Sequence, residues 1–285
     1  MSRLTITTEL VRAMVAEQFP DWADLPIRPV KASGWDNYTF HLGTEMSVRL
    51  PSAKRYAAQV AKEQTWLPRL APHLPVPIPT PVAMGLPSHG YPFHWSIMKW
   101  LTGTPANQAS SANQTQIASD LADFLSALQS APAENGPLAG PQNFYRGGEL
   151  YNYKDDVRRC LNELSGHVNV QKIEKLWDVA CASRWDRPPV WVHGDIAPGN
   201  FLVTENQLCA VIDFGASGIG DPACDLTIAW TYFTGDARET FIRSMGTDAN
   251  TWARAKGWGI WKALLELCEH KQGAQETLKT LINDD

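Results

Sequence analysis

The residues best suited to chemistry lie in one short stretch in the last third of the chain. His193, Gly194, Asp195 and Asn200 form the pattern H-G-D-x-x-x-x-N, and Asp213 follows at the start of an Asp-Phe-Gly triplet. With typical residue frequencies, the four fixed positions arise by chance on the order of once per thousand chains of this length. Carboxylate and amide oxygens also suit Mg²⁺, a hard cation that needs few protein ligands beside phosphate oxygens.

The residues between the two parts of this pattern explain its spacing. Two β-rich runs, FLV and LCAVI, flank a polar turn at residues 204–207, so we expect a hairpin there. A hairpin returns its second strand beside the start of its first, which places Asn200 and Asp213 at one open end, next to Asp195. Such a group could hold Mg²⁺ on nucleotide phosphates while Asp195 accepts the proton of an attacking hydroxyl, because phosphoryl transfer depends mostly on positioning and charge neutralisation.

These residues resemble the aminoglycoside phosphotransferase family, which is built like the eukaryotic protein kinases and includes macrolide phosphotransferases. The resemblance starts at HGDIAPGN and continues through AVIDFGASGIGDPACDLTIAW; it is tightest over 190–232 and extends over nearly all of the chain. It implies an α+β, protein-kinase-like bilobal fold, with a small antiparallel-sheet N-lobe and a larger helical C-lobe. It also implies that Asp195 is the catalytic base, that Asn200 and Asp213 bind Mg²⁺, and that ATP or GTP is the phosphoryl donor.

In the N-lobe, the resemblance assigns the phosphate clamp to a basic residue on the third strand and a glutamate on the next helix. Arg49 in SVRLP and Glu63 in AKEQ occupy these positions. The wider kinase group commonly has lysine where Arg49 stands, but arginine stays charged and can bind phosphate through two parallel hydrogen bonds. Lys54 is the alternative phosphate contact, although it lies beyond the strand.

Two further segments are expected to contact the nucleotide. The loop that contains Ser33 and Gly34 matches the family's phosphate-covering turn, although it lacks the G-x-G-x-x-G of protein kinases. The run SIMKWLTG resembles the hinge between the lobes. There Met98 is expected behind the adenine, with the backbone of Lys99 and Leu101 paired to its edge.

Two sets of residues are candidates for the acceptor site. Acidic side chains on or beside one helical segment could attract a polycationic aminoglycoside: Glu149, Asp155, Asp156 and Glu163. Aromatic side chains on two later segments could form an apolar floor for a macrolide ring: Trp230, Tyr232, Phe233, Trp258 and Trp261. Charged helix faces are usually only solvated and large aromatics are usually core, so a structural role is the stronger expectation for most of both sets.

Three residues near the motif have structural expectations. His193 is expected to orient the motif rather than act as a base. Asp225 is expected to be a buried acceptor for the backbone of the catalytic loop. Asp221 precedes Pro222 and is expected to cap the start of a helix.

The elements that must position these residues follow from the periodicity of apolar side chains. That periodicity predicts helices at 8–18, 56–70, 113–129, 151–164 and 170–184, with three or four more after 223. Short β-like runs fill the rest of the first hundred residues, and one β segment spans 190–214. We therefore expect an N-terminal nucleotide-binding lobe over 1–98, a hinge over 99–105 and a helical C-terminal lobe over 106–285, with the ligand at the seam.

The composition argues against several classes of function. The chain has 285 residues, of which 25 are Lys or Arg and 30 are Asp or Glu, so its net charge is −5. Nucleic acids and anionic membranes demand clustered Lys and Arg, so neither is expected as a partner. Five scattered cysteines without a C-x-x-C pair, and an N-terminus without the apolar core of a signal peptide, favour a reducing cytoplasm.

Together these features predict a cytoplasmic small-molecule kinase that needs Mg²⁺ and a nucleoside triphosphate. The resemblance places aminoglycoside or macrolide antibiotics first as acceptors, with a metabolic alcohol or sugar as the alternative within the same reaction class. Two other readings remain open: a nucleotide-binding module without turnover, and a metal-dependent hydrolase that uses the same carboxylates. The sequence does not distinguish ATP from GTP and leaves the oligomeric state open.

Overall fold

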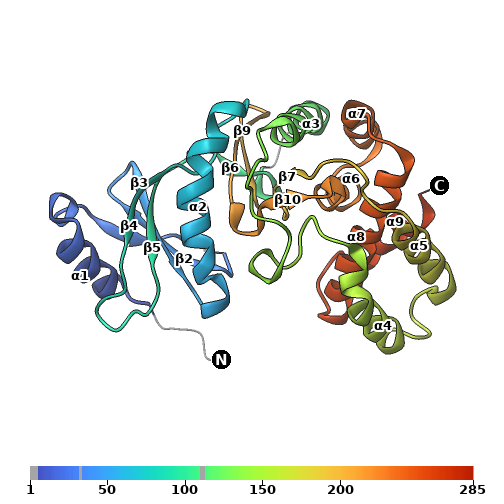
Figure 1. The fold of residues 1–285 in the computed structure, drawn as a ribbon, viewed down its shortest axis with the longest axis horizontal. Helices are drawn as coiled ribbons and strands as arrows, with labels where there is room; N and C mark the ends of the chain where they lie inside the picture. The colour runs from blue at the N-terminus through green and yellow to red at the C-terminus, as the bar shows by residue number, and fades with distance from the viewer. Residues whose placement is uncertain (1–5, 32–33, 110–112, 285) are drawn as a thin grey trace.

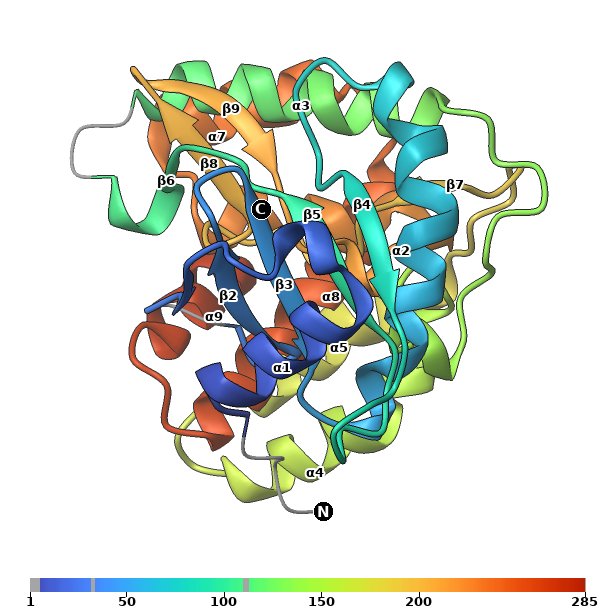
Figure 2. The ribbon, with the colours of Figure 1, turned by 90° about the vertical axis from the view of Figure 1, so that its left-hand side faces the viewer.

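The computed structural model describes residues 6–31, 34–109 and 113–284, which form two lobes of unequal size (Figure 1). The N-lobe is built on an antiparallel sheet with the strand order β1-β2-β3-β5-β4. Its strands are β1 (Ile27–Pro29), β2 (Asn37–Leu42), β3 (Met46–Pro51), β4 (Pro81–Gly85) and β5 (Trp95–Lys99). Helix α1 (Thr8–Gln18) covers the outer face of this sheet, and α2 (Ala57–Leu70) lies between the sheet and the C-lobe (Figures 1 and 2).

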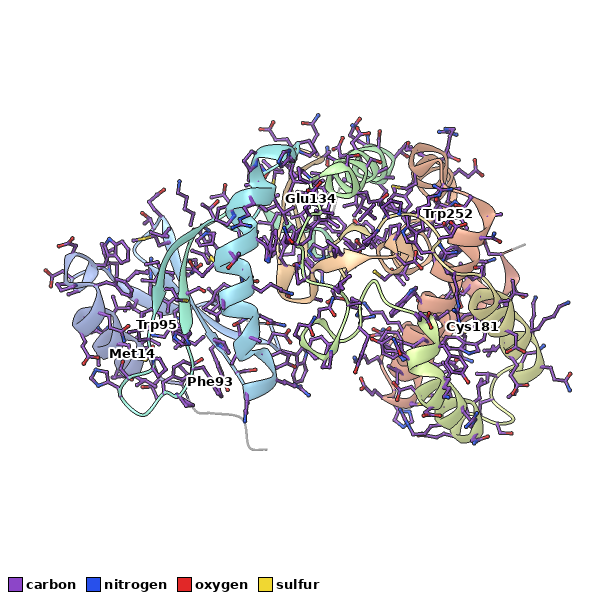
Figure 3. All side chains as sticks on the ribbon, in the orientation of Figure 1. Met14, Phe93, Trp95, Glu134, Cys181 and Trp252 are labelled. Atoms are coloured by element: carbon purple, nitrogen blue, oxygen red, sulfur yellow. The ribbon has the colours of Figure 1, made fainter. Side chains whose placement is uncertain are left out.

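Strand β3 explains how the sheet directs its side chains. Val48 and Leu50 are fully buried in one apolar cluster with Met14 of α1 and Trp95 of β5 (Figure 3). Successive side chains of a strand point to opposite faces, so Arg49 between them points the other way, toward α2. The alternation of the sequence V-R-L therefore places one cation on the inner face of the N-lobe.

The C-lobe is mainly helical and carries two small sheets. Its helices are α3 (Gln114–Ser130), α4 (Lys154–Glu163), α5 (Val170–Ala182), α6 (Ile228–Thr231), α7 (Gly235–Met245), α8 (Ala249–Cys268) and α9 (Ala274–Asn283). Its strands are β6 (Thr104–Pro105), β7 (Val190–Val192), β8 (Phe201–Thr204), β9 (Gln207–Val211) and β10 (Gly218–Gly220), paired in the orders β6-β8-β9 and β10-β7. These small sheets lie on the side of the C-lobe that faces the N-lobe (Figure 1).

The fold class predicted from the sequence is confirmed, and the helices agree closely. Those predicted at 8–18, 56–70 and 113–129 are α1, α2 and α3, each within one residue at either end. The prediction for 151–164 began too early, because residues 150–153 form a 3₁₀ turn ahead of α4. Among the described residues, no helix is both long and apolar enough to cross a membrane.

Candidate active site

The hairpin predicted after the H-G-D motif is present as β8 and β9. Phe201 pairs with Val211, and the amide of Ile212 donates to the carbonyl oxygen of Asn200 over 2.8 Å. The Asn200 side-chain nitrogen in turn donates to the backbone oxygen of Asp195 at 2.8 Å and reaches its Oδ2 at 3.3 Å. The hairpin thus fixes Asn200 beside Asp195 and brings the chain back to Asp213.

The backbone of the H-G-D motif is held by a buried carboxylate. Asp225 is 1% exposed and accepts from the amides of His193 and Gly194, both at 2.7 Å. The His193 ring donates from Nε2 to the carbonyl oxygen of Ile212 at 2.9 Å, and its Nδ1 accepts from the amide of Asp195 at 3.2 Å. Both residues have the structural roles expected from the sequence.

Gly194 must be glycine for a steric reason. Its φ of 85° lies in the left-handed region, and a Cβ there would collide with the carbonyl oxygen of Ala216. The motif loop therefore packs directly against the chain that follows Asp213, which ties the two acidic residues of the site together through the backbone.

Arg49 links the glutamate of α2 to the second acidic residue of the motif. Its Nη1 lies 3.3 Å from the Glu63 carboxylate, and its Nη2 lies 3.8 Å from Oδ1 of Asp213. Burial alone would lower the pKa of Arg49, but the charges of Glu63 and Asp213 outweigh burial and raise it. Lys54 is exposed on a 3₁₀ turn and does not line the cavity described below, so the geometry favours Arg49 as the phosphate contact.

A second basic residue, Lys62 of α2, contacts the same region, and it belongs to no motif that would have identified it from the sequence. The amine of Lys62 donates to the carbonyl oxygens of Gly215 and Ser217, at 2.6 and 2.7 Å. Burial lowers the pKa of this amine to about 8. Helix α2 therefore holds both Arg49, through Glu63, and the backbone that follows Asp213, through Lys62.

A cavity of about 390 Å³ opens at the seam of the lobes, which is the size of a small-ligand site. Its lining includes most of the predicted nucleotide residues: Gly34, Arg49, Met98, Lys99, Leu101, Asn200 and Asp213. Glu63 does not line it but contacts Arg49, which does. Ser33 lies outside the described residues. The amide of Lys99 already donates to Thr80 at 2.9 Å, so the atom that Lys99 can offer a base is its carbonyl oxygen.

The donor set at the mouth of this cavity fits Mg²⁺. The Asn200 side-chain nitrogen is engaged by Asp195, which leaves Oδ1 as the atom that would bind a cation. Asp213 is a non-glycine residue with a φ of 69°, and its carboxylate is 36% exposed toward the cavity. Two protein oxygens are a usual complement for Mg²⁺, which takes its other ligands from water and phosphate.

On its other side, Asp195 faces two cations that the sequence analysis did not identify. Its Oδ1 lies 3.3 Å from the amine of Lys262 on α8. The guanidinium of Arg146 lies over the ring of Trp261, 4.6 Å from its centroid, and 5.4 Å from that of Trp258. Burial raises the pKa of Asp195, but the attraction of Lys262 and Arg146 exceeds that effect and lowers it, so the carboxylate is ionised at neutral pH.

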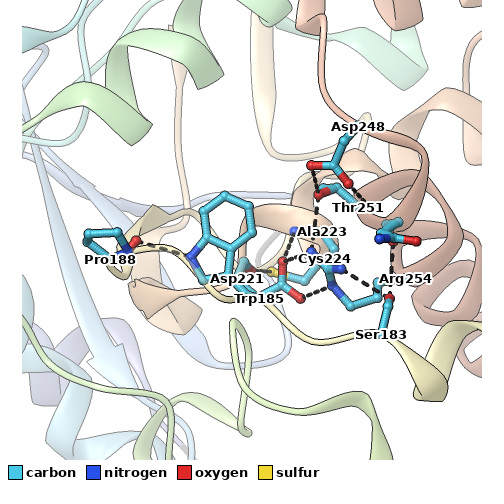
Figure 4. Close-up of polar contacts among 10 residues, drawn as sticks. Ser183, Trp185, Pro188, Asp221, Ala223, Cys224, Asp248, Thr251 and Arg254 are labelled. Atoms are coloured by element: carbon cyan, nitrogen blue, oxygen red, sulfur yellow. Dashed lines mark hydrogen bonds and ion pairs between the residues drawn. The ribbon is translucent and has the colours of Figure 1, made fainter.

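An ion-pair network fixes the start of α8, the helix that carries Lys262 (Figure 4). Asp248 caps the helix by accepting from the amide of Thr251 at 2.9 Å. Arg254 donates to Asp221 from Nε at 2.7 Å, and both side chains are buried. Asp221 also accepts from the amide of Ala223 at 3.1 Å, which is the cap expected from the sequence. This network therefore fixes the position of helix α8 relative to the segment that carries Asp225.

Of the residues predicted for the acceptor, Trp258 lines a small hollow beside Asp195, whereas most of the others lie elsewhere. Glu149, Asp155 and Glu163 are exposed and pair with Arg184, Arg158 and Arg159, at 3.6 to 3.8 Å. Asp156 accepts from Nε1 of Trp261 at 3.3 Å, so its carboxylate is engaged by that ring and does not line the hollow beside Asp195. Trp230 is buried and donates to Asp284, and the hydroxyl of Tyr232 lies 3.5 Å from the carbonyl oxygen of Ala106. Apart from Trp258, none of the predicted acceptor residues lines this hollow, whose walls include Arg146, Asp195, Thr227 and Lys262.

Comparison with known proteins identifies related sequences and folds. Residues 27–258 match the family described as the phosphotransferase enzyme family. No curated protein matches the sequence. Among solved structures, the GDP complex of aminoglycoside 2'-phosphotransferase-IIIa has a TM-score of 0.72 at 20% identity, with 98% of each chain covered.

Two other solved structures share this fold. The GDP and kanamycin complex of APH(2'')-IIia has a TM-score of 0.70 at 19% identity, and the similarity covers 96% of this chain and 97% of that one. A macrolide 2'-phosphotransferase from Brachybacterium faecium has a TM-score of 0.68 at 19% identity, with 97% of this chain and 99% of that one covered. At these identities the likeness establishes the kinase-like fold.

Proposed function

Because the chain belongs to the phosphotransferase enzyme family, we propose that it transfers the γ-phosphoryl group of ATP or GTP to a hydroxyl group of a small molecule. One observation of the site geometry supports this proposal most strongly. Asp195 and Asn200 are hydrogen-bonded to each other, and Asn200 and Asp213 line a cavity that Arg49 also lines, with its Nη2 3.8 Å from Asp213. That is the arrangement that a triphosphate, a divalent cation and an attacking hydroxyl require.

Each residue has a distinct part in the reaction. Arg49, held by Glu63, binds nucleotide phosphate oxygens from the N-lobe. Asn200 and Asp213 would hold Mg²⁺, which neutralises the charge that develops on the phosphoryl oxygens. Asp195 orients the acceptor hydroxyl and accepts its proton as the new oxygen–phosphorus bond forms. The bond between the γ-phosphorus and the β,γ-bridging oxygen breaks, and the nucleoside diphosphate leaves.

The structural neighbours suggest which molecules to test first. One of them holds GDP and kanamycin, and another is a macrolide phosphotransferase, so antibiotics with free hydroxyls are the first candidate acceptors. A metabolic alcohol or sugar is the alternative. We place the reaction in the cytoplasm, where nucleoside triphosphates are abundant and where the five cysteines would remain the free thiols that they are here.

Release of nucleoside diphosphate, measured with and without Mg²⁺ for ATP and GTP, tests the proposal against a panel of aminoglycosides, macrolides and simple alcohols. We expect release that depends on both Mg²⁺ and an acceptor. Asp195→Asn is expected to lower turnover by about 10²- to 10⁴-fold and to keep nucleotide affinity, because the amide cannot accept the proton.

Two results would contradict this assignment. Nucleotide binding without diphosphate release for any member of the panel would indicate a module without turnover. Phosphate release that added hydroxyl compounds do not change would instead indicate a hydrolase.

A further inference from the structure

A small hollow of about 10 Å³ beside Asp195 lies in the C-lobe and is separate from the nucleotide cavity; it has room for one group the size of a hydroxyl or a water. Its walls include Arg146, Asp195, Thr227, Trp258 and Lys262. The two cavities share no lining residue, although the hydrogen bond from Asn200 to Asp195 joins their walls. An acceptor hydroxyl that approaches Asp195 from this side would place the rest of its molecule against Arg146 and Lys262.

Arg146 is held in place by aromatic rings. Its guanidinium lies over Trp258 and Trp261, its Nε is buried without a hydrogen-bond partner, and in the described part of the chain no carboxylate lies within ion-pair distance of it. Aromatic faces attract a cation but do not satisfy its N–H donors. The guanidinium is therefore fixed near Asp195 and retains an N–H donor that could bind an oxygen atom of a ligand.

Two other carboxylates near the hollow are already engaged. Asp225 is buried and accepts from two backbone amides. Asp156 accepts from Trp261 and lies 3.7 Å from Nη2 of Arg159. The hollow therefore presents two cations and one carboxylate, and the carboxylate is the one that must bind the hydroxyl.

We propose that Lys262 and Arg146 bind an acidic group of the acceptor, so that the substrate is a hydroxyl compound bearing a carboxylate or phosphate rather than a polycation. This inference rests on the proposed phosphotransferase function and narrows its substrate class. It differs from a kanamycin-like acceptor, which would bring several ammonium groups toward these two cations.

The ion pair between Lys262 and Asp195 supplies the physical reason. Asp195 must exchange the amine of Lys262 for the acceptor hydroxyl before it can take up a proton. An anionic acceptor gives the displaced amine a new partner. A cationic acceptor would instead compete for Asp195 and leave Lys262, which is only 29% exposed, unpaired beside another positive charge.

The γ-phosphoryl group of the nucleotide is the other anion that Lys262 and Arg146 could bind. The structure favours an acidic group of the acceptor instead. The phosphate-facing residues Arg49, Asn200 and Asp213 line the seam cavity, whereas Lys262 and Arg146 line only the hollow. The test must nevertheless separate these two sources.

Two series of probes, matched in their carbon skeletons, vary the charge of the acceptor by replacing one group of a neutral parent. They are glycerate, glycerol and serinol, and glucuronate, glucose and glucosamine. Binding of each to the protein saturated with Mg²⁺ and a non-hydrolysable ATP analogue is measured by calorimetry, and turnover is measured by diphosphate release. We expect the acid of at least one series to bind and react at least about tenfold better than its neutral and amino partners.

Variants of Lys262 locate the charge that is recognised. Lys262→Met is expected to remove the preference for the acid and to raise the slow hydrolysis of nucleotide without acceptor, because it frees Asp195. Lys262→Glu is expected to shift the preference toward the amine. Lys271→Met is the control, because Lys271 is an exposed lysine that pairs with Glu269 outside the hollow. It changes the net charge equally and is expected to keep the preference.

Each alternative outcome overturns the proposal. Equal or better binding of the neutral or amino probe, or no binding of either acid, would contradict the proposal that the acceptor is anionic. An equal loss of turnover with every acceptor and of acceptor-free hydrolysis in Lys262→Met assigns the lysine to the nucleotide. A different result would contradict the proposed phosphotransferase function itself: equally slow release of diphosphate by wild type and Asp195→Asn with every hydroxyl compound.

Discussion

At the scale of single residues, the site depends on cations that are held in place before any ligand binds. Arg49 lies between Glu63 and Asp213, and Lys262 pairs with Asp195. Each cation would otherwise be a flexible side chain that loses conformational freedom on binding, and each is instead already ordered by an acidic partner. Arg49 and Lys262 approach the reaction from opposite lobes.

Arg49→Ala is expected to weaken nucleotide binding by about tenfold or more, because it removes a buried cation and leaves Glu63 without its partner. Lys54→Ala should leave the affinity unchanged, since Lys54 is exposed and does not line the cavity. Calorimetric titration with ADP and Mg²⁺ measures both variants. A larger loss of nucleotide affinity in Lys54→Ala than in Arg49→Ala would instead identify Lys54 as the phosphate contact.

The residues that could be predicted from the sequence were those in contiguous motifs. Asp195, Asn200 and Asp213 are brought together by a short hairpin, so local geometry was enough to group them. Lys262 and Arg146 belong to no motif, and Lys262 is separated from Asp195 by 67 positions. Helix α8 brings Lys262 to the site, and the loop ahead of α4 brings Arg146 beside Gly194; no local pattern encodes either contact.

At the scale of elements, Lys62 of α2 holds the backbone that follows Asp213, one of the two proposed Mg²⁺ ligands. Lys62→Met is expected to raise the Mg²⁺ concentration needed for half-maximal turnover, because it leaves the carbonyl oxygens of Gly215 and Ser217 without their donor. Lys62→Gln keeps an N–H donor and should retain more of the wild-type response. Activity measured across a Mg²⁺ titration distinguishes the variants, and an unchanged midpoint in Lys62→Met would exclude this role.

Helix α8 depends on the cap that Asp248 provides. Asp248→Ala is expected to lower the free energy of unfolding by about 1 kcal/mol at neutral pH. Hydrogen bonds from Thr251 lower the pKa of Asp248, so this stabilisation is present above the unfolded pKa of about 4 and is lost as the pH falls through the lower folded value. Urea titrations at several pH values should therefore show the two proteins converging in acid, and a constant difference would contradict the assignment.

At the scale of the whole molecule, the nucleotide cavity draws residues from both lobes, so a bound nucleotide would hold them together. ADP with Mg²⁺ at about 100 times its Kd is expected to raise the free energy of unfolding by about 2.7 kcal/mol. Thermal unfolding with ADP alone, with ADP and Mg²⁺, and after addition of EDTA measures the contribution of the metal. Asp213→Ala should show little difference between these conditions, and a metal-independent shift in the wild type would remove Asn200 and Asp213 from cation binding.

The bilobal organisation was predictable because apolar periodicity and strand alternation are local signals. The stripe of α3, with Leu121 and Leu125 fully buried, and the alternation around Arg49 illustrate both. How the lobes and the late helices pack was available only through resemblance. The acceptor side was the least predictable part, since acidic residues such as Asp155 proved to be paired on an outer surface.

The ion pair between Asp195 and Lys262 also decides what happens when nucleotide is bound and no acceptor is present. The carboxylate that would deprotonate a water molecule is then occupied by an ammonium group. If Asp195 is the base, as proposed, hydrolysis of nucleotide to no purpose would stay slow until an acceptor displaces Lys262, and the resting enzyme would consume little of the cell's nucleoside triphosphate.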